Sequence, residues 1–414
     1  VVVASCTPRT HEPLFQNTVR EAGLNSYLFE MANIRDQCSW VHMGEPEKAT
    51  KKSKDLVRMA VAKVSLLEPL ARRKVSVNHN ALVIGGGLSG MTAAQEIANQ
   101  GYDVYLIEKE KQLGGNLRRI HFLIDGRDPK KELDSLIENV KKNSKIHIYA
   151  GAKILNIDGF FGNFKTTLES GGKKTDIDHG VVIIATGAQE YKPKEYLYGK
   201  DERVVTQLEL EDKLRKSSGG DKRGIDIKKL KNVVMIQCVG SRDEERPYCS
   251  RVCCSEAVKN AIKIKEMNPR AKIFILYRDI RTYGFKESYY SRAREMGIVF
   301  IRYEDDKKPD VTKQDDVLKI SLPDPILNKQ VAINADLLVL SAATVPHPEN
   351  KDIAQLLKIS MGQDNYFLEA HMKLRPVDFA TEGVFLCGLA HSAKSIEESI
   401  SQACGAAARA SRAP

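Results

Sequence analysis

Apolar runs and amphipathic stretches alternate along most of the chain. Compact aliphatic runs predict buried strands at residues 81–84, 232–237 and 335–341, because a strand inside a parallel sheet is covered on both faces. Apolar positions at helical spacing predict helices at residues 255–267 and 395–411. Strands that alternate with helices indicate parallel sheets, and the two β-α-β units predict two such domains.

The first 77 residues predict a separate, small α/β domain. An apolar strand at residues 1–5 precedes a helix that we expect after Pro13, and a longer amphipathic helix is expected at residues 47–70. The basic, polar residues 71–80 predict a linker. Because the chain opens with VVVASC rather than Met, we expect it to be a fragment that begins inside a strand.

The stretches between the two β-α-β units carry weaker strand patterns. Strands are expected at residues 145–149 and 180–186, with two short strands between them. A hairpin is expected at residues 316–333. These segments extend the predicted sheets without adding candidate chemistry.

A glycine-rich turn separates the strand at residues 81–84 from the helix that follows it. Gly85, Gly87 and Gly90 form the pattern G-x-G-x-x-G, and Glu108 stands at the end of the next expected strand. The glycines allow a close approach to a pyrophosphate, the helix N-terminus supplies N–H groups, and the carboxylate accepts the ribose hydroxyls. The alternative is a glycine-rich turn in an empty α/β domain, and the complete context of the motif favours a dinucleotide.

Two later segments favour FAD over a nicotinamide dinucleotide. The sequence G-G-N stands at residues 114–116, and a buried strand ends in A-T-G at residues 185–187. This combination resembles the flavoprotein disulfide reductases of the thioredoxin reductase type, in which the A-T-G turn lets the chain leave the FAD domain. The resemblance implies that a C-terminal strand and helix, here residues 383–403, complete the flavin pocket.

The C-terminal segment departs from that family at one position. The family usually has Gly-Asp where this chain has Gly388-Leu389, so the usual carboxylate contact to the ribityl chain is missing. Lys394 and Ser395, or backbone groups, can take over that contact. The expected cofactor-binding residues are Gly85, Gly86, Gly87, Leu88, Ser89, Gly90, Glu108, Lys109, Gly115, Asn116, Leu117, Ala185, Thr186, Gly187, Gly388, Leu389, Lys394, Ser395 and Ile396.

Four cysteines crowd into the second β-α-β unit, where an NAD(P)H-dependent reductase would carry another glycine-rich loop. They are Cys238, Cys249, Cys253 and Cys254, with the spacing C-x10-C-x3-C-C. Four thiolates are the ligand set of a [4Fe-4S] cluster. Zinc also takes four cysteines but favours shorter C-x-x-C-like spacings, and scattered core cysteines would not crowd into one polar turn. The chain contains no C-x-x-C, so dithiol exchange by such a pair is not expected.

Together these segments resemble the A subunit of heterodisulfide reductase, the FAD and iron-sulfur component found in methanogens, sulfate reducers and related anaerobes. Besides the FAD fingerprint, the resemblance rests on SCTPRTHEPLF, MANIRDQCSWVH, GGNLRRIH, QCVGSRD with YCSRVCC, and FLCGLAHSAKSIEESI. It implies electron transfer through FAD and a [4Fe-4S] cluster. In some complexes of the family, flavin-based bifurcation splits an electron pair between a disulfide and ferredoxin.

The resemblance also implies partners and further chain segments. The partners would be ferredoxin, other heterodisulfide reductase-type subunits, and a subunit of a hydrogenase or formate dehydrogenase, and the chain would form a dimer within the complex. Family members usually have a Cys-rich start, and many end in a ferredoxin domain, so this chain is expected to be a fragment that lacks both. Cys6 and Cys38 are then either half of an N-terminal cluster or ordinary buried thiols, whereas Cys387 and Cys404 are expected to be small core residues.

These segments define one fold prediction. We expect an α/β protein with two Rossmann-like domains and a small N-terminal α/β domain at residues 1–77. The thioredoxin reductase-type FAD domain would consist of residues 78–190 and 335–414. The second domain, residues 191–334, would be inserted into it and would carry the cysteine motif.

Composition narrows the classes of function. The 414 residues are 42% hydrophobic and 29% charged, and no apolar run is long enough to span a bilayer. The net charge of +10 comes from bases that are mixed with acids, so we expect a solvated surface that faces an acidic partner protein rather than nucleic acid. Crowded cysteines without a signal peptide indicate metal or redox chemistry in the cytoplasm.

Lys259 is the expected catalytic residue. It lies five positions after Cys254, on the helix that leaves the cysteine motif, so its amine can point back toward the flavin ring. A cation there would favour the negatively charged reduced flavin. A surface lysine is the alternative. Arg242, Arg246 and Arg251 flank the thiols and are expected to be solvated loop residues, with compensation of cluster charge as their alternative role.

Three other interpretations stay open. Flavoprotein A of the quinone-interacting membrane-bound oxidoreductase has a similar size, but the N-terminal segment fits it less well. A self-contained NAD(P)H-dependent flavoprotein reductase predicts a second G-x-G-x-x-G after residues 232–237, which this chain lacks. A non-enzymatic scaffold would bind flavin and hold zinc with its cysteines, and the identity of the metal separates it from an iron-sulfur protein.

Overall fold

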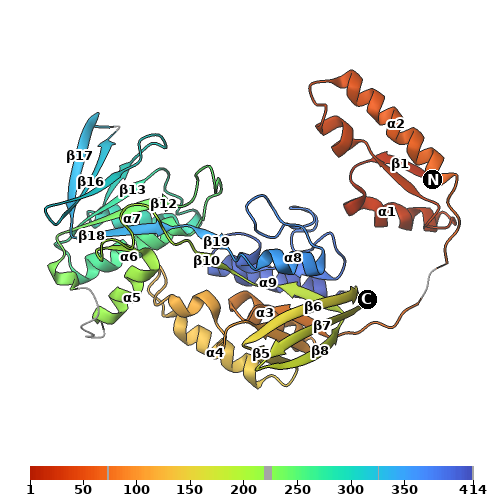
Figure 1. Ribbon diagram of the computed structural model, residues 1–414, viewed down its shortest axis with the longest axis horizontal. Helices are drawn as coiled ribbons and strands as arrows, with labels where there is room; N and C mark the ends of the chain where they lie inside the picture. Colours follow the sequence, from red (N-terminus) through yellow and green to blue (C-terminus); the bar gives the residue numbers. More distant parts are fainter. Residues whose placement is uncertain (72–73, 219–225, 325, 413–414) are drawn as a thin grey trace. The chain divides into compact units, whose positions relative to one another are not determined.

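The computed structural model divides into two compact units. The first unit contains Val1–Val77 with Glu369–Glu382, and the second contains Asn78–Leu368 with Gly383–Pro414. Figure 1 shows the elements of both units. The described residues are 1–71, 74–218, 226–324 and 326–412. Within these residues no helix combines the length and the apolar character that crossing a bilayer requires.

The first unit is built around a two-stranded parallel sheet. Its elements are β1 (Val2–Ser5), α1 (Pro8–Glu21), β2 (Glu30–Asn33), the π-helical turn η1 (Arg35–Trp40) and α2 (Pro46–Val64). The long helix α2 packs on both strands and on η1. Ala32, Cys38 and Ala60 are buried between these elements, so the unit has an apolar interior of its own.

Helix α1 begins earlier than the sequence predicts, because Pro13 lies inside it. Thr7 caps the helix, and its Oγ1 accepts a hydrogen bond from the Arg9 backbone N–H. A proline inside a helix leaves the carbonyl four residues earlier without its donor. Here that carbonyl belongs to Arg9, and it accepts a hydrogen bond at 3.5 Å from the guanidinium of Arg375. A residue distant in the sequence therefore compensates the proline and brings Glu369–Glu382 into the first unit.

The second unit contains two parallel five-stranded sheets. The first parallel sheet consists, in spatial order, of β20 (Val384–Leu386), β9 (Val181–Ile184), β3 (Ala81–Ile84), β4 (Val104–Glu108) and β5 (Ile146–Ala150). The helices packed with it are α3 (Leu88–Asn99), α4 (Pro129–Lys142) and α9 (Ile396–Ala410). In this sheet Ile84 of β3 lies opposite both Ile107 and Ile184, so the carboxyl ends of the three central strands are level.

A three-stranded antiparallel sheet follows β5, where the sequence predicts two short strands. Its strands are β6 (Ala152–Phe160), β7 (Asn163–Ser170) and β8 (Lys173–His179). The third strand escapes prediction because most of its residues are polar and exposed, and of its two buried residues, Ile177 and His179, only one is apolar. His179 Nε2 lies 2.7 Å from Thr166 Oγ1, and burial lowers the pKa of this histidine to about 4.

The second parallel sheet consists, in spatial order, of β11 (Val204–Thr206), β18 (Leu337–Ala342), β12 (Asn232–Val239), β13 (Lys272–Tyr277) and β14 (Val299–Arg302). Its helices are α5 (Gln207–Ser218), α6 (Cys253–Met267) and α7 (Glu287–Glu295). The expected hairpin is part of a three-stranded antiparallel sheet made of β15 (Asp310–Gln314), β16 (Val317–Asp324) and β17 (Lys329–Ala335). Two Rossmann-like sheets are thus present, as the sequence predicts.

Strand β18 lies in the second parallel sheet, between β11 and β12. The sequence assigns residues 335–341 to the first domain, because an uninterrupted apolar strand is compatible with either sheet. We therefore propose that the inserted segment ends near residue 343 rather than at residue 334. The chain passes between the two sheets through an antiparallel ribbon formed by β10 (Ala188–Glu190) and β19 (Thr344–Pro346).

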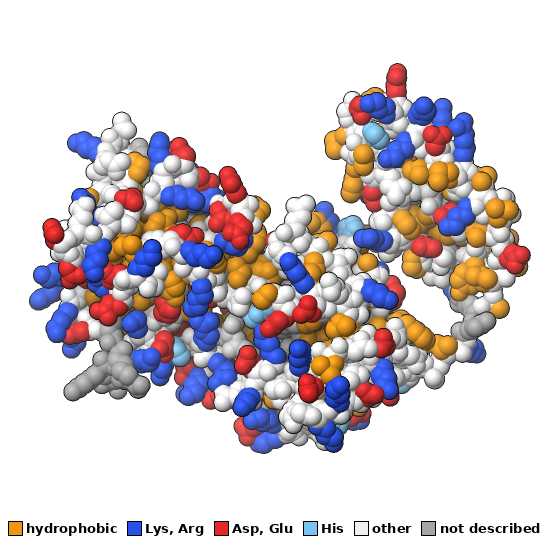
Figure 2. Space-filling view, viewed as in Figure 1, with side chains coloured by type: hydrophobic (Ala, Val, Ile, Leu, Met, Phe, Trp, Pro, Cys, Tyr) orange, Lys and Arg blue, Asp and Glu red, His pale blue; other side chains and the backbone are white. Residues whose placement is uncertain are grey.

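The remaining elements are helix α8 (Asn350–Leu357) and the short helical turns η2 (Gly115–Arg119), η3 (Ile227–Lys229), η4 (Gly284–Lys286) and η5 (Gly388–Ala390). Lys and Arg side chains are interspersed with Asp and Glu side chains on the visible face (Figure 2). Many of them are paired, as in the 2.7 Å contact between Lys109 Nζ and Glu349 Oε2. On that face the positive charge is spread over the surface.

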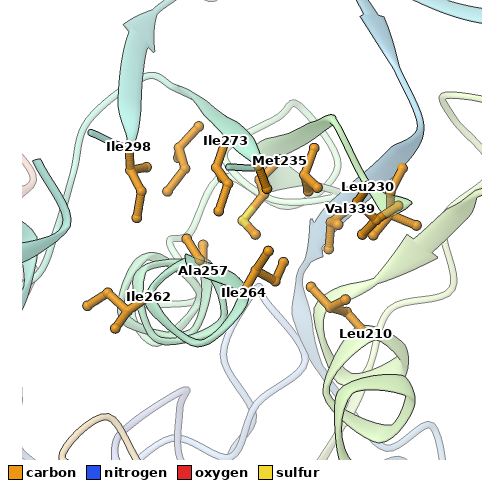
Figure 3. Close-up of a cluster of buried hydrophobic side chains, with 14 of the residues drawn as sticks. Leu210, Leu230, Met235, Ala257, Ile262, Ile264, Ile273, Ile298 and Val339 are labelled. Atoms are coloured by element: carbon orange, nitrogen blue, oxygen red, sulfur yellow. The ribbon is translucent and has the colours of Figure 1, made fainter. Parts of the chain in front are cut away.

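The core of the second parallel sheet lies between its strands and helices α5 and α6 (Figure 3). Ile264 of α6 and Leu210 of α5 point toward the strands that carry Met235 and Val339. All four side chains are fully buried. This core places the N-terminal turn of α6 beside the carboxyl end of β12, where the cysteine motif lies.

We expect Leu210→Ala to lower the free energy of unfolding by about 2–5 kcal/mol, because it removes buried methyl groups and leaves a cavity. Urea unfolding followed by far-UV circular dichroism measures the change. Leu368→Ala is the matched control, since Leu368 is 45% exposed, and it should cost less than about 1 kcal/mol. Equal losses in the two variants would contradict the assignment of Leu210 to the core.

Candidate functional site

The glycine-rich turn between β3 and α3 is packed so closely that side chains are excluded at two positions. A methyl group on Gly85 would lie 2.2 Å from the Ala185 carbonyl oxygen, and one on Gly90 would lie 1.8 Å from the Gly85 carbonyl oxygen. Gly85 also has a φ of +115°, which favours glycine. At Gly87 the nearest atom to such a methyl group would be Gly115 Cα at 3.9 Å. This position is therefore open, and Gly87 lines a cavity.

Glu108 holds the same turn from the end of β4. Its Oε2 accepts a hydrogen bond at 2.7 Å from the Gly86 backbone N–H, and its Oε1 accepts one at 2.7 Å from that of Glu110. Each carboxylate oxygen keeps further acceptor capacity. The side chain is nearly buried but lines the cavity, so the carboxylate is oriented at the strand end where Rossmann-type sites bind a ribose.

A cavity of about 1080 Å³ extends from this turn to the helices of the second parallel sheet. Its volume suits a large cofactor. The expected cofactor-binding residues that line it are Gly85, Gly87, Leu88, Ser89, Glu108, Lys109, Gly115, Asn116, Leu117, Ala185, Thr186, Gly187, Leu389, Lys394, Ser395 and Ile396. The expected residues outside the lining are Gly86, Gly90 and Gly388. A methyl group on Gly388 would lie 2.2 Å from Ser89 Oγ, so this glycine allows η5 to approach α3.

The cavity has walls that the sequence does not predict. Ile120, Phe122 and Ile124, after η2, line it from one side. Ser255 and Glu256, in the first turns of α6, line it from the second sheet. Burial raises the pKa of Glu256 to about 7. The sequence offers one indication of the first wall, the apolar residues that follow G-G-N. These residues lack the periodicity that identifies a helix or a strand.

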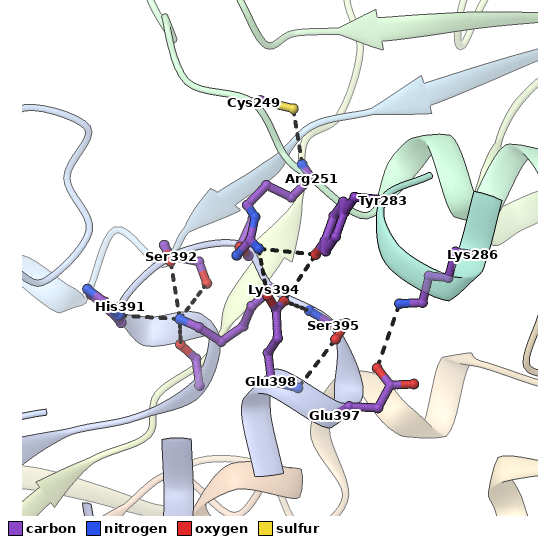
Figure 4. A network of polar contacts seen from close by, with 12 residues as sticks. Cys249, Arg251, Tyr283, Lys286, His391, Ser392, Lys394, Ser395, Glu397 and Glu398 are labelled. Atoms are coloured by element: carbon purple, nitrogen blue, oxygen red, sulfur yellow. Dashed lines mark hydrogen bonds and ion pairs between the residues drawn. The ribbon is translucent and has the colours of Figure 1, made fainter. Parts of the chain in front are cut away.

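Lys394 and Ser395 have local partners at the start of α9 (Figure 4). Lys394 Nζ donates to the Gly388 carbonyl oxygen at 2.9 Å and to Ser392 Oγ at 3.1 Å. Ser395 Oγ accepts the Glu398 backbone N–H at 3.3 Å, and Glu398 Oε2 accepts the Ser395 N–H at 2.8 Å, which completes a capping box. Both residues therefore order the loop that closes the cavity.

Lys259 is held at the cavity wall by a buried ion pair. Its Nζ lies 2.5 Å from Glu211 Oε2 and donates to the Phe122 carbonyl oxygen at 3.2 Å. The Glu211 side chain is fully buried, and its Oε1 accepts the backbone N–H groups of His121 and Phe122. The Lys259 side chain is 9% exposed and lines the cavity, so it is not the solvated surface lysine that was the alternative.

The cysteine motif occupies the carboxyl end of β12 and the first turn of α6. Cys238 follows a register shift in β12, and Cys253 and Cys254 begin α6. Burial, then the charges of Cys254 and Cys249, raise the pKa of Cys238 to about 11. A hydrogen bond between the adjacent thiols lowers the pKa of Cys254 and raises that of Cys253. The four thiols thus interact in one neighbourhood.

The four thiols are suitable ligands for a metal centre, but their arrangement in the structure is not that of one. Four thiols suit an iron-sulfur cluster or zinc. In the described residues, however, no group of three or more His, Cys, Asp or Glu side chains is arranged to hold a metal ion. The flanking arginines are paired rather than solvated: Arg242 with Asp279 at 2.8 Å, Arg246 with Glu245 at 2.6 Å and Arg251 with Glu398 at 2.6 Å.

The other four cysteines belong to other elements of the chain. Cys38 is fully buried in the first unit, where Cys6 Sγ accepts a hydrogen bond from Arg35 at 3.6 Å. Cys387 is fully buried behind η5, and Cys404 is partly buried in α9. Cys387 is thus a small core residue, as the sequence predicts, whereas Cys404 is less buried than expected.

The model of the pyridine nucleotide-disulphide oxidoreductase family matches residues 79–236. Among solved structures, the thioredoxin reductase of Lactococcus lactis has a TM-score of 0.56 at 16% identity, with 80% of this chain and 97% of that chain covered. This likeness confirms the thioredoxin reductase-type α/β fold predicted from the sequence.

Curated relatives match almost the whole chain. The A subunit of the "H(2):CoB-CoM heterodisulfide,ferredoxin reductase" of Methanothermobacter thermautotrophicus is 37% identical over 99% of this chain and 75% of that protein. An iron-sulfur A subunit of the CoB–CoM heterodisulfide reductase of Methanopyrus kandleri is 38% identical over 100% of this chain and 76% of that protein. The resemblance seen in the sequence is confirmed: the chain is an oxidoreductase and belongs to the family of heterodisulfide reductase A subunits.

Proposed function

We propose that this chain is the FAD and [4Fe-4S] electron-transfer component of a cytoplasmic heterodisulfide reductase-type complex. One observation carries the proposal. Val252 and Ser255, which flank Cys253 and Cys254, line the same cavity as Gly87 of the dinucleotide turn. A flavin in this cavity would therefore contact residues that flank the cysteine motif, although none of the four cysteines lines the cavity itself.

The residues of the chain perform separate tasks at this site. Gly87 and the N-terminus of α3 receive the pyrophosphate, and Glu108 accepts the ribose hydroxyls. When bound, FAD supplies two-electron redox chemistry. Lys259 presents a fixed ammonium group at the cavity wall, and Glu211 holds it there, so that positive charge faces the space where negative charge develops on reduction. The loop after η2 and the start of α9 line this space.

Cys238, Cys249, Cys253 and Cys254 are the proposed cluster ligands. Their support is the number and type of donors, their mutual electrostatic interactions and their place next to the cavity. Among the described residues the thiols are not arranged with the geometry of a metal site. The presence of the cluster is therefore the first quantity to measure.

The proposed partners are ferredoxin, other heterodisulfide reductase-type subunits, and a subunit of a hydrogenase or formate dehydrogenase, and the chain is proposed to form a dimer in the complex. Support comes from the names of relatives, which join dihydrogen or formate with CoB-CoM heterodisulfide and ferredoxin. Electron bifurcation between a disulfide and ferredoxin is part of the proposal. A self-contained NAD(P)H reductase is disfavoured, because the cysteine motif follows β12 where such an enzyme has its glycine-rich loop.

The first test is an anaerobic preparation assayed for flavin, iron and zinc, with electron paramagnetic resonance spectra before and after dithionite. We expect one FAD and about four irons per chain, and a signal from the reduced cluster. NADH should not bleach the flavin. Zinc without iron would contradict the proposal and support the non-enzymatic scaffold. Rapid bleaching of the flavin by NADH would support the NAD(P)H-dependent reductase instead.

Cys254→Ser tests whether the cysteine motif holds the cluster. We expect it to lose most of the iron while it keeps FAD, because the glycine turn and Glu108 are untouched. Cys404→Ser is the matched control, since Cys404 is a partly buried cysteine on α9, and it should keep the iron of the parent protein. Equal iron in the two variants would exclude Cys254 as a ligand.

Gly87→Ala tests the dinucleotide turn. The added methyl group meets no protein atom nearer than 3.9 Å, so the unliganded protein should unfold at the same urea concentration as the parent. The same group enters the cavity, and we expect FAD to bind at least about tenfold more weakly, a loss of about 1.4 kcal/mol. Flavin fluorescence titration measures this. Gly44→Ala, also open but outside the cavity, should bind FAD normally, and normal binding by Gly87→Ala would contradict the site.

Lys259→Met and Glu211→Gln test the charge at the cavity wall. Loss of the cation should lower the flavin midpoint potential by about 30 mV, and loss of the anion should raise it, since 30 mV corresponds to about 1.4 kcal/mol for a two-electron couple. Spectroelectrochemistry measures both shifts. Lys265→Met, on the same helix but outside the lining, should leave the potential unchanged. If Lys259→Met and Glu211→Gln also leave the potential unchanged, the ion pair has a purely structural role.

A further inference from the structure

Arg251 joins the cysteine motif to the helix that closes the cavity (Figure 4). Its backbone N–H donates to Cys249 Sγ at 3.3 Å. Its guanidinium group donates to the Ala393 carbonyl oxygen at 3.2 Å, to Tyr283 Oη at 3.1 Å and to Glu398 Oε1 at 2.6 Å. One residue thus contacts a thiol of the motif, the loop before α9 and the first turn of α9.

The acceptor at the centre of this network also shapes the cavity. Glu398 Oε1 receives Arg251, while its Oε2 receives the Ser395 backbone N–H at 2.8 Å and the Tyr283 hydroxyl at 3.3 Å. Ser395 and Ile396 line the cavity. Any movement of the Arg251 side chain is therefore transmitted to the capping box that positions a wall of the cofactor site.

A second, weaker contact reaches the same turn of α9. Lys286, from the turn η4 beside the second sheet, lies 3.7 Å from Glu397 Oε2. The covalent connection between the two sheets is the narrow ribbon of β10 and β19. A sheet attached through two short strands needs further contacts to keep one orientation. Two such contacts reach the start of α9, where Glu397 pairs with Lys286 and Glu398 pairs with Arg251.

Arg251 takes up this role in an unfavourable backbone conformation. Its φ is +59°, in the left-handed region that is costly for a residue with a branched or long side chain. Glycine would relieve the cost but would carry no guanidinium. The planar, five-donor guanidinium serves a carbonyl, a hydroxyl and a carboxylate together, in a fixed geometry.

We propose that Arg251 is a positioning residue that clamps the cysteine motif to the first turn of α9 and so sets the separation between the motif and the flavin cavity. Its consequence for electron transfer rests on the proposed function, whereas the clamp itself does not. Breaking the clamp should loosen the motif and α9 together, although they are more than a hundred residues apart in the sequence.

Amide hydrogen–deuterium exchange, read by mass spectrometry on the anaerobically purified full chain, tests the clamp. Arg251→Gln and Glu398→Gln should each raise exchange roughly 5- to 30-fold in residues 249–256 and also in residues 391–400. Gln at position 398 still fits a capping box, so its effect reports the lost ion pair. The effect of the double variant should be clearly less than the two single effects combined, because both substitutions remove the contact between Arg251 and Glu398. Arg292→Gln breaks an exposed pair with Glu266 and is the control that should change neither segment.

Arg251→Lys distinguishes the clamp from a general effect on folding. Lys and Gln have similar backbone preferences at this φ, but Lys keeps the charge toward Glu398, so exchange in residues 391–400 should lie between the parent and Arg251→Gln. Visible circular dichroism of bound FAD should change in Arg251→Gln and recover in part in Arg251→Lys. Faster exchange confined to residues 249–256, or additive effects in the double variant, would overturn the proposal.

The same samples separate the clamp from the proposed function. Iron content and electron paramagnetic resonance are recorded alongside exchange. Coupled exchange in a parent protein that holds no iron supports the clamp while it ends the iron-sulfur interpretation. In a parent protein that holds the cluster, an altered signal in Arg251→Gln at unchanged iron content supports the proposal that the side-chain contact also positions the motif, and an unaltered signal overturns that part of it.

Discussion

The contact of the β3–α3 turn with Ala185 is the constraint on which the site depends. The parallel register levels β3 with β4 and β9, so their carboxyl ends meet at one edge of the sheet. Gly85 and Gly90 then bring the start of α3 to the closest distance that two backbones permit. The edge remains open at Gly87, and the oriented carboxylate of Glu108 faces the same opening. Parallel pairing, two glycines, the backbone of Ala185 and one acid therefore shape the dinucleotide end of the cavity.

The other end of the cavity depends on polar ties between the two sheets. Lys259 and Glu211 reach across to the backbone of His121 and Phe122, and Arg251 reaches to Glu398. The Lys259–Glu211 pair is buried, and such a pair contributes little to stability relative to apolar contacts of the same size, so its main effect is to place charge. Polar contacts of this kind join the two sheets and place fixed charges beside a cofactor that binds between them.

The parts of this arrangement differ in how far the sequence predicts them. The Gly85–Gly90 turn is a local consequence of strand, turn and helix, and its spacing identifies it together with the strand before it, the helix after it and Glu108 at the end of the next strand. The predicted start of helix α1 is wrong because Arg375, far along the chain, supplies the bond that Pro13 removes. The predicted sheet of β18 differs from the observed one because an apolar strand does not encode its neighbour. The ties of Lys259 and Arg251 join segments more than a hundred residues apart, and no periodicity records such pairs.

The cysteine motif is the segment whose local structure is least explained by folding alone. Cys238, Arg242 and Arg251 all adopt positive φ values there, at a cost of about 1–3 kcal/mol each. Among the described residues, the buried amide of Gln237, next to Cys238, has no hydrogen-bond partner. If stability alone decided, glycine would be favoured at positions 238, 242 and 251, and an apolar side chain would be favoured at position 237. Because strain of this kind concentrates at functional sites, these costs indicate that the segment is shaped to place its thiols beside the cavity.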